Sequence, residues 1–227
     1  MNKNDICIYC RKTITNKSRE HAIPKSLFQV ENRVNLITVP CSVECNNSFS
    51  KDNEEFKIFL LLEEETANQD TATKLVEEVL RALRRKEKKG FINELFEKSD
   101  SIMVKSPRGI ETKFSYDPNM EVLNRIVKRI VSCLYYHKFK VMIPLDYTIQ
   151  VYEKTSVLRS GEQVIKVINQ FGIWLKDTPI VSIGNGTFKY KCVPVVDQQH
   201  ATLWKMIFYN VITFWATVIK MPENIEK

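Results

Sequence analysis

Apolar residues recur at two different spacings along the chain, and these spacings divide it into regions. Residues 1–53 show no long amphipathic period and are typical of short strands and turns. Residues 52–70, 71–89 and 122–137 repeat their apolar side chains three and four positions apart, which predicts three helices. After Pro144, apolar and polar residues alternate in stretches rich in β-branched and aromatic side chains, which predicts antiparallel strands.

The predicted strands fall in two places. A short pair is expected near residues 101–104 and 111–116, because the turn residues of segment 107–109 lie between them. The longer strands are expected within residues 147–154, 163–176, 187–196 and 202–220.

The expected fold class is α+β, with helices between an N-terminal module and a C-terminal antiparallel-sheet domain. We expect the small N-terminal module at residues 1–55, a helical connector at 56–100 and an α+β domain at 101–227. In that last domain the helix of residues 122–137 should back the sheet. The module is so short that a structural metal would help it to fold.

Charge is distributed unevenly over the predicted helices. Helix 52–70 is strongly acidic, whereas helix 71–89 ends in the basic run RALRRKEKK before Gly90. Cations at a helix C-terminus complement the helix dipole, and most charge runs are solvated surfaces. The same run is also suited to nucleic acid, so Arg84 and Arg85 are candidate phosphate contacts.

The composition indicates a folded protein, and its net charge favours polyanions, although many basic proteins bind no nucleic acid. Hydrophobic residues make up 44% of the 227 residues, enough for a buried core, and the formal net charge is +7. No stretch approaches the roughly 20 apolar residues that cross a bilayer, and the start of the chain lacks a secretory signal. We therefore expect a cytoplasmic protein without membrane association, in which six cysteines are thiols or metal ligands rather than disulfides.

Four of the cysteines form two closely spaced pairs. Cys7 and Cys10 stand in a CxxC pattern, and Cys41 and Cys45 stand in a CxxxC pattern. Two such knuckles can place four thiolates tetrahedrally around structural Zn²⁺. The alternatives are independent core cysteines or a redox CxxC pair, but a redox pair normally belongs to an α/β pattern that residues 1–50 lack. Cys133 lies on the apolar stripe of helix 122–137, where a packed thiol is expected.

Polar residues in a fixed order lie within and just after this cysteine frame. Glu20 and His21 stand in the segment REHAIPKSLF, Asn35 precedes the second knuckle in NLITVP, and Asn46 directly follows Cys45. Four thiolates already complete the coordination of zinc, so His21 is available for other chemistry.

The segment CIYC…REHAIPKSLF…NLITVPCSVECNNSFSK, over residues 5–55, resembles the HNH nuclease family with its ββα-metal fold. His21, Asn35 and Asn46 stand at the H, N and final N/H positions of that family. The resemblance implies that His21 is the general base, that Glu20 and Asn46 ligate Mg²⁺ or Mn²⁺, and that Asn35 orients His21. The family often has aspartate in place of Glu20, and Asn47 is the alternative to Asn46 as ligand.

The resemblance therefore implies a metal-dependent endonuclease that hydrolyses phosphodiester bonds in DNA, with RNA not excluded. Lys25 and Lys51 join the candidate phosphate contacts. The family resemblance also suggests a component of antiphage defence or of a mobile element, with a protein activator or a second copy of the chain as partner. The alternative is a non-catalytic zinc module that binds nucleic acid or a protein.

Overall fold

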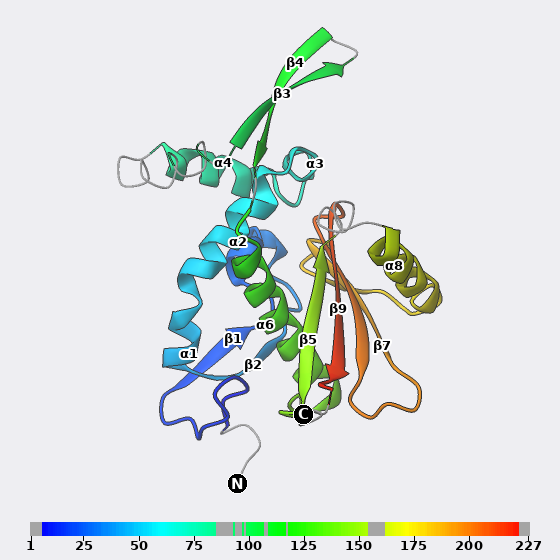
Figure 1. The fold of residues 1–227 in the computed structure, drawn as a ribbon. Helices are drawn as coiled ribbons and strands as arrows, with labels where there is room; N and C mark the ends of the chain where they lie inside the picture. Colours follow the sequence, from blue (N-terminus) through cyan, green and yellow to red (C-terminus); the bar gives the residue numbers. More distant parts are fainter. Residues whose placement is uncertain are drawn as a thin grey trace.

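The chain is described by a computed structural model that covers residues 6–84, 93, 97, 99–106, 109–116, 118–153 and 162–222. In this part of the chain the fold is α+β, as the sequence predicts, with two β-hairpins and one five-stranded antiparallel sheet arranged around the helices (Figure 1). No helix in these residues is long and apolar enough to span a membrane.

The N-terminal region is an antiparallel hairpin followed by helices. Strand β1 (Lys17–His21) pairs with β2 (Thr38–Ser42), and the loop between them contains the 3-10 turns η2 (Lys25–Leu27) and η3 (Val30–Asn32). Helix α1 (Val43–Ser48) begins directly after β2, because the side chain of Ser42 accepts a hydrogen bond from the backbone N–H of Cys45. The element order is therefore β-β-α.

The acidic segment predicted as one helix forms two. Helix α2 (Ser50–Leu62) ends at Glu63, whose extended backbone separates it from the short helix α3 (Glu64–Ala67). Helix α4 (Thr73–Leu83) confirms the start of the next predicted helix. Residues 85–90, which include the candidate contact Arg85, lie outside the described residues.

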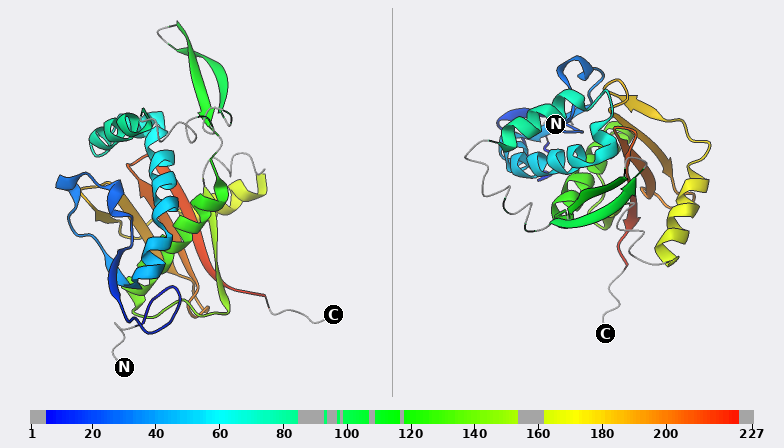
Figure 2. Two further views of the ribbon diagram at one scale, coloured as in Figure 1. Left: turned by 90° about the vertical axis from the view of Figure 1, so that its left-hand side faces the viewer. Right: turned by 90° about the horizontal axis from the view of Figure 1, so that it is seen from above.

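The predicted strand pair after α4 forms a long hairpin. Strands β3 (Ser99–Ser106) and β4 (Gly109–Tyr116) pair along their whole length, and Gly109 adopts a φ of 122° at the turn. This hairpin projects away from the rest of the described residues in Figure 1 and in the left-hand view of Figure 2.

The predicted helix of residues 122–137 is confirmed as α6 (Met120–Phe139). The side chain of Asn119 accepts hydrogen bonds from the first backbone N–H groups of this helix, and Lys140 ends it in the left-handed conformation with a φ of 58°. Its apolar stripe is buried, and α6 packs against α2, β2 and the large sheet.

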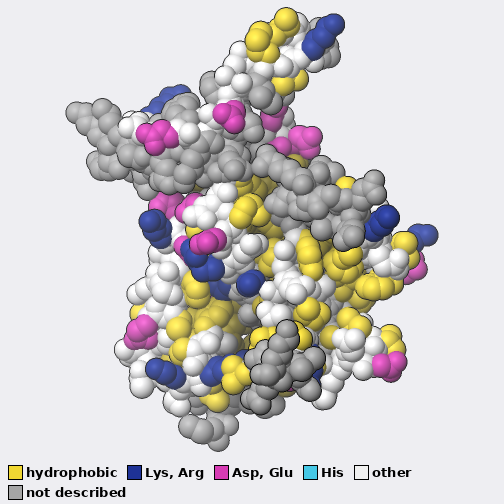
Figure 3. Space-filling model, in the orientation of Figure 1, with side chains coloured by type: hydrophobic (Ala, Val, Ile, Leu, Met, Phe, Trp, Pro, Cys, Tyr) yellow, Lys and Arg dark blue, Asp and Glu magenta, His cyan; other side chains and the backbone are white. Residues whose placement is uncertain are grey.

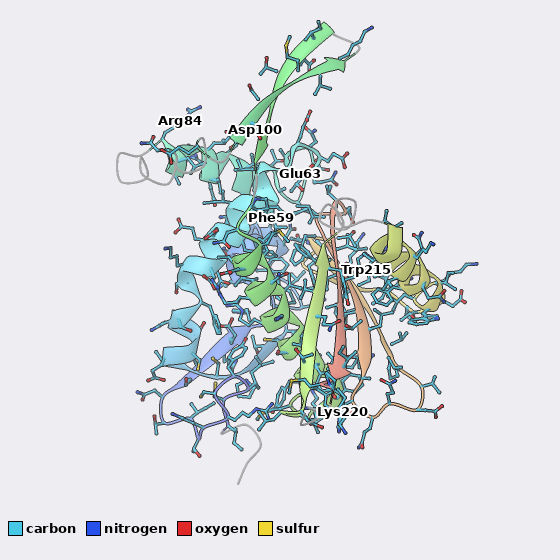
Figure 4. All side chains as sticks on the ribbon, viewed as in Figure 1. Phe59, Glu63, Arg84, Asp100, Trp215 and Lys220 are labelled. Atoms are coloured by element: carbon cyan, nitrogen blue, oxygen red, sulfur yellow. The ribbon has the colours of Figure 1, made fainter. Side chains whose placement is uncertain are left out.

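The large sheet has the strand order β5-β9-β8-β7-β6. Its alternating side chains separate two faces: Trp204, Met206 and Phe208 belong to the main core, whereas Leu203 and Trp215 face α8 (Figure 4). The strands are β5 (Tyr147–Glu153), β6 (Val181–Ile183), β7 (Phe188–Pro194), β8 (Thr202–Phe208) and β9 (Ile212–Lys220).

The strand predicted within residues 163–176 is wrong, because this segment forms helix α8 (Glu162–Trp174). The β-branched side chains in QVIKVINQ favour a strand by local propensity. However, Ile168, Phe171 and Leu175 lie three and four positions apart and pack together against the outer face of the sheet. Burial of this helical stripe outweighs the local preference.

One continuous hydrophobic core joins the two ends of the chain in the described residues. It contains Val39 of β2, Phe56 of α2, Ile130 of α6 and Phe214 of β9. Phe56 lies edge-on to Phe208, with ring centroids 5.4 Å apart. The hairpin and the large sheet are therefore packed around shared helices, while the domain boundaries predicted at residues 55 and 100 stay a prediction.

Candidate functional site

Three of the four predicted zinc ligands converge in the structure. The sulfur atoms of Cys7, Cys10 and Cys45 all lie within 4.8 Å of one another, and this is the one group of three or more His, Cys, Asp or Glu side chains that converges in the described residues. Cys41, the fourth predicted ligand, does not belong to this group. Its thiol donates to the carbonyl of Ser42.

The chemistry of the three thiols suits a soft divalent cation. Burial acts to raise the pKa of the Cys7 thiol, but hydrogen bonds with backbone groups, foremost that of Ser42, outweigh it and lower the pKa to about 7. Burial raises the pKa of Cys41, and the neighbouring Cys7 adds to this effect. Since the thiolate is the metal-binding form, Cys7 is the thiol best prepared to ligate.

Glu20 lies on β1 opposite Val39 and is almost completely buried, with 4% of its surface exposed. Its nearest cation is Arg129 of α6, whose Nη1 is 3.4 Å from Oε1 of Glu20. Burial raises the pKa of the Glu20 carboxyl, and Arg129 opposes part of that shift. The carboxylate predicted to ligate a cation therefore already lies beside one positive charge.

Asn46 lies on the same side of the hairpin as Glu20. Its Nδ2 donates a 2.7 Å hydrogen bond to Oγ of Ser18, and Ser18 and Glu20 share one face of β1 because they are two positions apart. Asn46 uses the N–H end of its amide in this bond, so its oxygen is the end that could ligate a cation. Its neighbour Asn47 is exposed, which favours Asn46 as the inward-facing amide.

His21 is the last residue of β1, and strand alternation directs it to the face opposite Glu20. Its Nδ1 is buried and has no hydrogen-bond partner among the described residues. The pKa of His21 is lowered by burial first and then by the positive charges of Lys25 and Arg33. This shift favours the neutral imidazole, which is the form that can accept a proton.

Asn35 does not contact His21 through that buried nitrogen. It is exposed and adopts the left-handed conformation, with a φ of 56°. Two residues further along, the carbonyl of Ile37 accepts a hydrogen bond from the backbone N–H of Ala22. Asparagine is among the residues that tolerate this conformation best. What the structure shows for Asn35 is thus a turn residue in the loop that returns to β2.

Of the basic residues predicted to contact phosphate, the three that the structure describes do not gather in one place. Lys25 and Lys51 are exposed near the hairpin and α2, whereas Arg84 lies at the far end of α4, well separated from β1 (Figure 4). On the face drawn in Figure 3, Lys and Arg side chains are scattered among acidic ones. Arg33, which sequence reasoning passed over, is one of the two cations that act on His21.

Sequence reasoning also missed the residues that surround Glu20. Arg129 is 4% exposed, its Nη2 donates a 2.6 Å hydrogen bond to Oδ1 of Asn53, and its guanidinium lies 4.6 Å from the ring centroid of Phe49. A signal was present: Arg129 interrupts the apolar face of α6 between Ile126 and Cys133. A charged residue on a buried stripe requires a buried partner.

No family model, curated protein or solved structure matches this chain. Whether the metals suggested by the sequence fit this chain is therefore judged from the ligand atoms of its own side chains. The thiol cluster fits Zn²⁺, whose preferred ligands include cysteine sulfur. The carboxylate of Glu20 and the amide oxygen of Asn46 are hard donors of the kind that Mg²⁺ and Mn²⁺ take.

Proposed function

We propose that this chain is a metal-dependent endonuclease of the HNH type that hydrolyses phosphodiester bonds in DNA. The observation that supports this most is the placement of Glu20 and Asn46 on one face of a β-β-α unit whose first strand ends at His21. Strand alternation directs His21 and Glu20 to opposite faces at the last two positions of β1, so the proposal requires a phosphate that binds at the end of this strand and reaches both side chains there.

In this proposal His21 accepts the proton from the attacking water. The water oxygen forms a bond to phosphorus, and the bond from phosphorus to the leaving ester oxygen breaks. Solvent water protonates the leaving oxygen, so one product ends in a phosphate and the other in a hydroxyl. The neutral form of His21 suits this role, since burial and two nearby cations lower its pKa. Lys25 and Arg33 place positive charge where a phosphate would approach the imidazole.

Glu20 and Asn46 would hold a hard divalent cation such as Mg²⁺ or Mn²⁺. When bound, such an ion offsets the negative charge that builds up on the phosphate oxygens during hydrolysis. Cys7, Cys10 and Cys45 would hold Zn²⁺ as a structural ion, with Cys41 as the proposed fourth ligand. Zinc would then fix α1, which carries both Cys45 and Asn46, against the first knuckle.

The test is cleavage by the purified full chain. Supercoiled plasmid, linear duplex, single-stranded DNA and RNA are each incubated with Mg²⁺ or Mn²⁺, with a chelator in the control. We expect nicked or linear DNA products that depend on the divalent ion and are lost in the E20A variant. A protein that carries zinc and is folded but leaves every substrate intact in both ions contradicts the proposal.

A non-catalytic zinc module that binds nucleic acid or a protein is the second candidate. The burial of Glu20 beside Arg129 favours it, because a buried ion pair can be purely structural. The two functions differ in the binding of Mn²⁺. The enzyme should have a second, weaker divalent site that depends on Glu20, whereas the binding module should retain zinc alone.

A further inference from the structure

Arg129 is a buried cation at the junction of three elements. Its guanidinium contacts Glu20 of β1, Phe49 between α1 and α2, and Asn53 of α2. Arg129 itself belongs to α6, which lies between the β1–β2 hairpin and the large sheet and contacts both (Figure 1). One side chain of the second half of the chain therefore reaches the candidate metal ligand.

The contacts of Arg129 hold its guanidinium in place but leave some of its N–H groups without a hydrogen bond. Nη2 donates to Asn53, and the ring of Phe49 covers the guanidinium at 4.6 Å. Its Nε and Nη1 form no hydrogen bond among the described residues, although Nη1 lies 3.4 Å from the Glu20 carboxylate. An ion pair of that length is electrostatic rather than bidentate, so a second cation could share the carboxylate without a hydrogen bond being broken.

The next contacts along α6 show that this face of the helix is a docking surface for the N-terminal region. One turn before Arg129, Arg125 pairs with Asp52 of α2, with Nε 2.8 Å from Oδ2. One turn after it, the sulfur of Cys133 lies 2.9 Å from the hydroxyl of Tyr9 in the first knuckle. Tyr9 in turn packs edge-on against Phe49. Arg129 is the central contact of this row.

We propose that Arg129 is a positioning residue of the candidate nuclease site, which fixes the direction of the Glu20 carboxylate from α6. This inference rests on the proposed function. It means that a metal ligand of the β1–β2 hairpin is oriented by a side chain of α6, in the second half of the chain. Outer-sphere partners of this kind orient metal ligands and typically change metal affinity by roughly 10- to 100-fold.

The experiment measures Mn²⁺ affinity by electron paramagnetic resonance on the zinc-loaded full chain. The R129M variant keeps the length and apolar stem of the side chain but loses the charge. We expect it to bind Mn²⁺ roughly 10- to 100-fold more weakly and to cut DNA only at Mn²⁺ concentrations that raise its occupancy again. The matched control is R125M, which breaks the neighbouring and exposed α6–α2 ion pair and should bind Mn²⁺ like the wild type.

A second variant keeps the inference testable if R129M does not fold. N53A removes one anchor of Arg129 without removing either charge, so it should weaken Mn²⁺ binding in the same direction by a smaller factor. Wild-type affinity, or tighter binding, in a folded R129M or N53A protein overturns the positioning role while the nuclease proposal stands. A wild-type chain that neither binds Mn²⁺ nor cuts DNA overturns both.

Discussion

Gly184 connects the large sheet to the loop between β1 and β2, and its replacement by alanine should weaken that connection. It lies in the turn between β6 and β7, where its backbone N–H donates to the carbonyl of Val34. Its φ is +61°, a conformation that strains any residue with a Cβ atom. An added Cβ would lie 2.2 Å from Cδ1 of the buried Phe28 ring and 2.8 Å from the carbonyl oxygen of Asn32.

Two effects determine how far the free energy of unfolding falls in G184A. The left-handed backbone costs about 1–2 kcal/mol for a residue with a Cβ, and the overlap with a packed ring costs about 1–3 kcal/mol more. The free energy of unfolding of G184A should therefore fall by about 2–5 kcal/mol. For a chain of this size, each kcal/mol lowers the melting temperature by about 2–4 °C, so the expected decrease is about 4–20 °C.

Thermal unfolding followed by circular dichroism measures this decrease, and two other glycines serve as controls. Gly172 lies inside α8 with no heavy atom within 4 Å of an added Cβ, so G172A should stabilise the chain by about 0.5–1 kcal/mol. Gly186 has a φ of +88° but meets only the end of Lys189, at 3.6 Å, so G186A should show the backbone strain alone. If G184A has the same melting temperature as the wild type, the loop between β1 and β2 does not pack on this turn, which contradicts the shared core described above.

Other predictions test the cysteine cluster and the core of the sheet. Substitution C45S or C10S should remove most of the zinc measured by elemental analysis of the purified chain. The control C192S, in β7, should retain it. Equal zinc in all three variants would mean that the cysteine cluster is not the zinc site. Trp204 is fully buried and donates from Nε1 to Oγ1 of Thr202 at 2.8 Å. W204A should therefore lower the free energy of unfolding by about 3–5 kcal/mol in urea titration, and a loss below 1 kcal/mol would contradict a close-packed core around that ring.

The sequence predicts those parts of the fold in which local preference and burial agree. Helix α6 combines a buried apolar stripe with an asparagine cap. The hairpin of β3 and β4, whose Met103 and Ile110 are exposed, is instead predicted from local turn residues. Helix α8 was missed because Val164, Ile165 and Val167 favour strands locally. Its helical stripe becomes decisive only against the outer face of the sheet, which the sequence does not display.

The candidate site likewise has one part that the sequence predicts and another that it does not. The CxxC spacing is enough to predict that Cys7 and Cys10 converge, and Cys45 joins them, whereas its partner Cys41 in the CxxxC pair lies outside the cluster. The surroundings of Glu20 could not be predicted, since Arg129 lies far away in the sequence and reaches Glu20 only after α6 packs against the hairpin. Long-range contacts of this kind depend on the assembled core and leave only an indirect signal, here a charged residue on an apolar helical face.

The most direct test of the proposed function is the rate of Mn²⁺-dependent plasmid cleavage by the H21A variant. The matched control is H137A, which removes an exposed histidine in the last turn of α6 that has no proposed role in the site. If His21 is the general base, H21A should cut about 10²- to 10⁴-fold more slowly with unchanged zinc content and melting temperature, and H137A should cut at the wild-type rate. Cleavage by H21A at the wild-type rate would contradict the account.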